Sequence, residues 1–291
     1  MRPAIKVFLA AMLLCLSLLP GCQREEPVAT PQNSGFVDAN PAYRDNFGTP
    51  PQGKEGRAFA RVGYLPLQQE PEKLRALPLF LFTDQDQLEK ILARLVSGEL
   101  LPHRDSDLYN PFPGDLVLSI TSADGPTVTL DLTTQQEWPA ADLVAGSRAL
   151  AETALQFAAV KRVIILLNGS PVTNMPADGF VHEQGLLVQV GPPKLILLSG
   201  VWEQGAEALN EILVEFDRPI KMKNFKLSTT DGSNVEGDYY TSIFQMAVVV
   251  HPIEPGRYHD GTQLQVDWEV ADDLGRANRG TSTLPLRRVE Q

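Results

Sequence analysis

The sequence predicts an α+β domain followed by an all-β sandwich domain. Between residues 77 and 190, strand-like apolar runs alternate with segments whose apolar residues have helical spacing. From residue 191 onward, short β-rich runs recur and are separated by turn signals. A chain of 291 residues fits two folded domains, because one domain usually takes roughly 100–200 residues. The hydrophobic content of 43% also suits globular structure.

Residues 1–21 have the pattern of a secretory signal peptide. Arg2 and Lys6, with no acidic residue beside them, precede the apolar run Val7–Leu19. A helix of that length reaches roughly 20 Å, whereas the hydrocarbon core of a bilayer needs about 30 Å. The run therefore predicts export rather than a transmembrane helix.

The tetrapeptide Leu19-Pro20-Gly21-Cys22 resembles the bacterial lipobox. The resemblance implies cleavage before Cys22 and attachment of diacylglycerol to its sulfur as a thioether, with palmitate among the acyl chains, and two or three acyl chains anchor a protein stably. A plain signal peptide with an accidental cysteine is the alternative. Gln23, rather than Asp, follows the cysteine, which implies the periplasmic side of the outer membrane if the cell has two membranes.

Both cysteines of the chain, Cys15 and Cys22, lie in this leader region. The mature chain would keep Cys22 alone, so the sequence predicts no disulfide and no cysteine-based metal site. The net charge is -11, and removal of Arg2 and Lys6 gives -11 - 2 = -13. This acidic balance disfavours nucleic acid as a partner, and it leaves the lipid to hold the protein at its membrane.

Residues 22–76 are predicted to form a flexible, proline-rich tether. Prolines recur from Pro27 to Pro71, and no sustained apolar period accompanies them. A coil of about 50 residues spans on the order of 40 Å. A short ordered piece near Phe59–Leu65 is the alternative within this stretch.

Residues 77–190 are predicted to fold as β-α-β-β-α-β, a sheet with helices on one face. The first helix is expected to begin at Thr83 or Asp84 and to end near Gly98, and Asp124-Gly125 marks a hairpin turn. The expected strands are 77–83, 116–120, 127–132 and 162–167, and the second helix is 141–159.

These elements resemble a GerMN domain, named for sporulation and germination proteins. The resemblance rests on "DLVLSI", the hairpin into "VTLDL", the helix "ALAETALQF" and the closing "VKRVIILLNG". It implies a membrane-tethered envelope module, found in sporulation proteins and other bacterial lipoproteins, without a catalytic site. Nothing in this chain indicates a spore former.

Residues 191–291 are predicted to form a β-sandwich, because short β-rich runs alternate with turn signals such as Asp231-Gly232 and Asp260-Gly261. The expected strands are 195–198, 212–216, 225–227, 244–250, 264–270 and 281–286. The blocks "VEFDRPI" and "YHDGTQLQVDWEVADDLGRANRG" resemble bacterial Ig-like domains of the SbsA and CopC type.

Copper-binding members of that wider group use histidine with further His, Asp or Met ligands. His251 and His259 are weak metal candidates here, because no third ligand accompanies them. The expectation is that both are ordinary residues at strand ends, and that the protein has neither a metal site nor a cofactor.

No nucleophile elbow, zinc-helix, P-loop or dinucleotide motif occurs in the sequence. We therefore expect a non-catalytic, lipid-anchored envelope protein that binds envelope proteins or peptidoglycan through its GerMN-like domain. Two alternatives remain open, a peptidoglycan-modifying hydrolase and a periplasmic copper-binding protein that uses the Ig-like domain.

Overall fold

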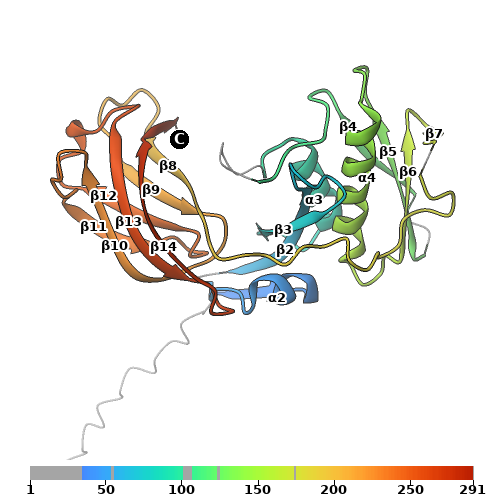
Figure 1. The fold of residues 1–291 in the computed structure, drawn as a ribbon, viewed down its shortest axis with the longest axis horizontal. Coiled ribbons are helices and arrows are strands. Elements are labelled where there is room, and N and C mark those ends of the chain that lie inside the picture. The colour runs from blue at the N-terminus through green and yellow to red at the C-terminus, as the bar shows by residue number, and fades with distance from the viewer. Residues whose placement is uncertain (1–34, 54–55, 101–106, 123–124, 174, 291) are drawn as a thin grey trace, which may run out of the picture. The chain divides into compact units, whose positions relative to one another are not determined.

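The computed structural model describes residues 35–53, 56–100, 107–122, 125–173 and 175–290 (Figure 1). The fold is mixed, with many strands and few helices. The predicted signal peptide 1–21 and the predicted lipidation site Cys22 lie outside the described residues. Among the described residues, no helix is both long and apolar enough to cross a bilayer.

The first half of the described chain alternates strands and helices. Two sheets form there, one in the order β1-β2-β3 and one in the order β4-β5-β6-β7. The elements are β1 (Phe36–Ala39), α2 (Pro41–Phe47), β2 (Arg57–Pro66), β3 (Leu74–Leu81), α3 (Gln87–Val96), β4 (Val117–Ser122), β5 (Thr127–Thr133), α4 (Ala140–Leu155), β6 (Arg162–Leu167) and β7 (Ser170–Pro171).

Helices α3 and α4 contact both sheets. Helix α4 packs against β2 of the first sheet and β6 of the second, and α3 packs against β2 and β4. Strand β1 runs parallel to β2, and β5 runs parallel to β6 across the α4 crossover. The β4–β5 pair is the antiparallel hairpin expected at Asp124-Gly125.

Two predictions for this half are wrong. The predicted tether 22–76 is ordered from β1 onward, and its residues 57–66 form the long strand β2. The strand expected at 77–83 therefore pairs with β2 and not with the hairpin, so the elements form two sheets rather than one. Strand β2 is buried along almost its whole length, so it lacks the polar-apolar alternation that marks a half-exposed strand.

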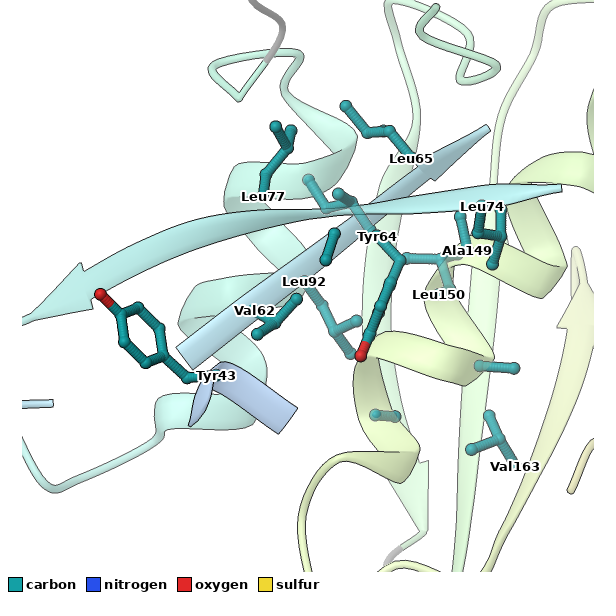
Figure 2. Close-up of a cluster of buried hydrophobic side chains, with 14 of the residues drawn as sticks. Tyr43, Val62, Tyr64, Leu65, Leu74, Leu77, Leu92, Ala149, Leu150 and Val163 are labelled. Atoms are coloured by element: carbon teal, nitrogen blue, oxygen red, sulfur yellow. The ribbon is translucent and has the colours of Figure 1, made fainter. Parts of the chain in front are cut away.

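The core of this half is formed by side chains from both sheets and from the helices. Figure 2 shows labelled side chains from β2 and β3 together with side chains from the helices in one cluster. Tyr64 of β2 is buried, and its backbone N–H donates to Thr153 Oγ1 of α4 at 3.1 Å. The other labelled members are Tyr43, Val62, Leu65, Leu74, Leu77, Leu92, Ala149, Leu150 and Val163.

Helix α3 begins later than the predicted caps Thr83 and Asp84. The residue before the helix is Asp86, in the left-handed region with φ 54°, and its side chain accepts no capping hydrogen bond. Thr83 instead accepts a hydrogen bond from the backbone N–H of Gln85 at 3.1 Å, which forms a local turn. The expected capping site is therefore used to make a turn that precedes the helix.

The second half, from residue 195, is all β apart from one short 3-10 helix, which is consistent with the predicted sandwich. One sheet has the order β11-β12-β9-β8-β15 and the other β10-β13-β14, and both contribute to one buried cluster. The elements are β8 (Leu195–Trp202), β9 (Glu211–Phe216), β10 (Lys221–Thr229), β11 (Gly237–Thr241), β12 (Ala247–Pro252), η2 (Pro255–Arg257), β13 (Gln263–Ala271), β14 (Ala277–Pro285) and β15 (Arg287–Glu290).

A buried charge network links the two sequence blocks that resemble Ig-like domains. The guanidinium of Arg218 lies 2.7 Å from Asp217 and 3.5 Å from Asp272, and its side chain is only 2% exposed. Arg218 also donates to the carbonyl of Gly191 at 2.6 Å, and Arg276 donates to that of Val190 at 2.7 Å. These residues therefore hold the segment that leads into the sandwich.

Candidate functional site

The strongest candidate site is a cavity of about 610 Å³ beside helix α4, a volume within the range of about 300–1,000 Å³ typical of small-ligand sites. We call it the α4 pocket. Helix α4 supplies one wall, and the segment after β7 supplies the other. The lining residues are Val144, Arg148, Met175, Pro176, Gly179, Phe180, Val181, His182 and Glu183.

Backbone hydrogen bonds fix the second wall of the α4 pocket. Phe180 exchanges two of them with Val163 of β6, at 2.7 and 2.9 Å. Further along, Leu74 of β3 donates to the carbonyl of Leu186 at 3.0 Å and accepts from Val188 at 2.9 Å. This segment is therefore attached to both sheets of the first half, although it contains no long strand.

Gly179 is required where the wall turns. Its φ is +82°, and a Cβ atom there would lie 2.7 Å from the carbonyl oxygen of Val163. Both the left-handed backbone and the close approach to β6 favour glycine. Its own N–H donates to the carbonyl of Pro176 at 2.8 Å, which closes the turn.

A buried acid lies behind the exposed rim of the α4 pocket. The Glu152 side chain is 5% exposed, and its Oε1 lies 2.6 Å from Nδ1 of His182, whose side chain is 63% exposed. Burial raises the pKa of Glu152, the nearby His182 lowers it, and the charge of Glu183 raises it further. A buried carboxyl with a shifted pKa at a cavity is a common feature of functional sites.

Two charged side chains of the α4 pocket have no partner within the described part of the chain. Arg148 is half-buried and lies one helical turn before Glu152, yet no ion pair or hydrogen bond joins its side chain to a described residue. The exposed carboxylate of Glu183 is likewise without a described ion pair. The pocket thus combines an unpaired cation, an unpaired anion and an apolar lining.

This arrangement suits the binding of a small amphipathic ligand. The apolar area comes from Val144, Phe180 and Val181, and Arg148 can pair with a carboxylate through two parallel hydrogen bonds. Among the described residues, no group of three or more His, Cys, Asp or Glu side chains is placed to hold a metal ion.

The two metal candidates from the sequence lie in the sandwich, away from helix α4 in the chain. His251 is on β12, with Nε2 2.9 Å from the Tyr240 hydroxyl and Nδ1 3.3 Å from the carbonyl of Asn210. His259 follows the short helix η2, and its backbone N–H donates to Thr262 Oγ1 at 2.9 Å. Both ring nitrogens of His251 therefore have hydrogen-bond partners within the protein.

Sequence reasoning did not select the residues of the α4 pocket. Glu152 lies within the predicted second helix, and no local pattern separates it from the other charged residues of that helix, Asp142 and Arg148. No motif in the sequence marks His182. Its meeting with Glu152 depends on the path of the segment after β7, which no local pattern specifies.

A comparison with protein families matches residues 63–173 to the family Germane, described as "Sporulation and spore germination". This match supports the predicted GerMN resemblance, and it begins within strand β2, in the stretch that was predicted to be tether. It covers less than half of the chain and contains Arg148 and Glu152 of the α4 pocket, but not His182. No curated protein matches the chain.

Several solved structures resemble parts of the chain. The first GerMN domain of the sporulation protein GerM from Bacillus subtilis is 20% identical over 44% of this chain and 96% of that chain, with a TM-score of 0.34. The tandem GerMN domains of the same protein are 16% identical over 67% of this chain and 61% of that chain, with a TM-score of 0.35. CopC from Methylosinus trichosporium OB3b is 12% identical over 34% of this chain and 97% of that chain, with a TM-score of 0.24. Likenesses with scores this low carry no conclusion about function.

Proposed function

We propose that this protein is a lipid-anchored component of the bacterial cell envelope that binds an envelope partner or the cell wall through its GerMN-type domain. The observation that carries the proposal is the family match over residues 63–173. The same chain begins with a leader that resembles a lipobox. In this account Cys22 holds the chain at the membrane, and the α4 pocket contributes the binding chemistry.

The α4 pocket supports a binding role. Its charged side chains Arg148 and Glu183 are unpaired within the described chain, so a ligand can neutralise them without first breaking an ion pair. Its second wall is held by backbone hydrogen bonds to β6 and β3. A pocket with a fixed wall loses less conformational entropy when it binds a ligand.

The anchor is tested by labelling and fractionation of cells that express the full chain or Cys22→Ser. We expect the wild type to incorporate labelled palmitate and to sediment with membranes, and the variant to lose both properties. Equal labelling of the two chains, or membrane association that does not depend on Cys22, would refute the anchor.

A peptidoglycan hydrolase is the second candidate, and one observation favours it. Burial raises the pKa of Glu152, and raised carboxyl pKa values are typical of general acids. The mature protein is incubated with labelled wall fragments, and released soluble product is measured for the wild type and Glu152→Gln. The binding account expects no release from either protein. Release that is lost in Glu152→Gln would establish the hydrolase instead.

A further inference from the structure

We infer that the α4 pocket binds a short peptide that carries a free carboxylate and an amino group, of the kind found in the stem peptides of the cell wall. This inference rests on the proposed envelope function and names the ligand class for it. Three features of the pocket carry the argument, namely the unpaired Arg148, the unpaired Glu183 and the apolar surface between the two walls.

Arg148 determines the anionic end of the ligand. Arg148 is half-buried as a residue and has no described counter-charge, so its guanidinium can pair with an incoming carboxylate without first leaving another acid. The nearest acid along the helix, Glu152, is already engaged by His182 at 2.6 Å. Arg148 is therefore available to bind the carboxylate of a ligand.

Glu183 and His182 determine the second polar end. The Glu183 carboxylate is exposed at the same cavity and has no described ion-pair partner, so it can accept hydrogen bonds from an amino group. With Nδ1 of His182 directed to Glu152, Nε2 is the ring nitrogen left for a ligand atom. The pocket therefore offers one cationic and one anionic contact, which matches a ligand with both charges.

The apolar lining and the volume favour a small peptide over a large protein surface. Val144, Phe180 and Val181 can cover aliphatic side chains such as the methyl groups of alanine. A cavity of about 610 Å³ suits a ligand of drug-like size, whereas a stable protein–protein interface buries about 800 Å² on each partner and is usually flatter. A wall stem peptide has the required carboxylate, amino group and alanine methyl groups.

The test is calorimetric titration of the full-length protein, purified in detergent, with the synthetic stem tetrapeptide L-Ala-D-Glu-diaminopimelate-D-Ala. We expect measurable binding by the wild type. Binding should weaken about tenfold or more when the peptide carboxyl terminus is amidated, and also in Arg148→Gln. Glu183→Gln should weaken binding mainly to the peptide whose amino groups are free.

Arg279→Gln is the matched control, because Arg279 is an exposed arginine on β14 of the sandwich. It should bind the tetrapeptide as the wild type does. Thermal unfolding of Arg148→Gln should match that of the wild type, which separates lost contacts from lost folding.

Three outcomes would overturn the inference. Absence of binding would refute a wall stem peptide as the ligand of the α4 pocket. Lipid labelling at Cys22 and crosslinking in the envelope test the proposed function separately. Equal binding to the all-L peptide Ala-Glu-Lys-Ala would indicate a protein partner in place of the wall. Tetrapeptide binding that is unchanged in Arg148→Gln would place the ligand elsewhere.

Discussion

At the scale of single residues, the buried acid Glu152 makes the stability of the fold depend on pH. Burial raises its pKa above the ordinary value of 4.5. Stability linked to a raised pKa is fully present below the unfolded value and is lost as pH rises through the folded value. The wild type should therefore lose stability relative to Glu152→Gln as the pH rises from about 4.5.

Urea denaturation of both proteins across that pH range measures this difference. Glu203→Gln is the control, because loss of this exposed carboxylate should change the free energy of unfolding by less than about 0.5 kcal/mol. A constant difference between the wild type and Glu152→Gln at all pH values would show that Glu152 is not desolvated in the fold.

Substitution of two glycines in the segment after β7 distinguishes the cost of backbone strain from the cost of a steric clash. Gly179 and Gly185 both have positive φ, +82° and +79°, but only at Gly179 would an added Cβ atom meet backbone, at 2.7 Å from Val163 O. Gly185→Ala should cost about 1 kcal/mol of stability. Gly179→Ala should cost about 1–3 kcal/mol more, because the wall must move away from β6.

Chemical denaturation gives both free energies, and tetrapeptide titration shows whether the moved wall still binds. Equal destabilisation by the two substitutions would mean that the contact between Gly179 and β6 is not maintained in solution.

At the scale of elements, helix α2 tests whether the fold begins well before residue 77. Tyr43 is fully buried, and its hydroxyl has no hydrogen-bond partner among the described residues. Tyr43→Ala should therefore cost about 3–5 kcal/mol through the cavity it leaves. Tyr43→Phe should be neutral or slightly stabilising, because it removes an unsatisfied buried group.

Asp45→Ala is the matched control on the same helix, since Asp45 is exposed and should contribute less than about 0.5 kcal/mol. Thermal or urea unfolding measures all three variants. If Tyr43→Ala unfolds like the wild type, α2 is not part of the cooperative unit and the tether prediction for this segment regains support.

The same elements mark how far the sequence could predict the fold. Helix α3 was predicted because its apolar residues have helical spacing, and the β4–β5 hairpin was predicted because Asp124-Gly125 specifies a tight turn. Strand β2 was predicted only as the alternative, a short ordered piece near Phe59–Leu65, because a strand covered on both faces has no alternation and its Gly63 and Pro66 are typical of linkers. Its partner β1 is parallel and distant in sequence, and no local pattern encodes such a pairing.

In the sandwich, strands β11 and β15 were also missed. Strand β11 is largely exposed, so its residues Tyr239 and Tyr240 do not show one buried face. Strand β15 is the last four residues before the end of the described chain, and it pairs in parallel with β8. The α4 pocket escaped prediction for a related reason, because His182 meets helix α4 only through tertiary structure.

At the scale of the whole molecule, the buried charges of the sandwich hold the segment that joins its two halves. Arg218 lies between Asp217 and Asp272 and also binds the carbonyl of Gly191. Arg218→Met would leave two buried carboxylates without that partner, so we expect a loss of about 3–5 kcal/mol. Arg279→Met on exposed β14 should change stability by less than about 0.5 kcal/mol.

Urea unfolding followed by tryptophan fluorescence reports this loss, because Trp202 and Trp268 belong to the sandwich core. Retention of full stability in Arg218→Met would show that the buried network contributes specificity without net stabilisation.

The central claim is that the GerMN-type domain contacts the envelope through the α4 pocket. The most direct measurement is photocrosslinking in living cells, with a photoreactive residue at Val181 on the pocket rim or at Val289 on β15; these side chains are 52% and 43% exposed. We expect an adduct containing wall peptide from position 181, absent from position 289 and lost when Arg148→Gln is added. No wall-peptide adduct at position 181, or equal adducts at both positions, would contradict the account.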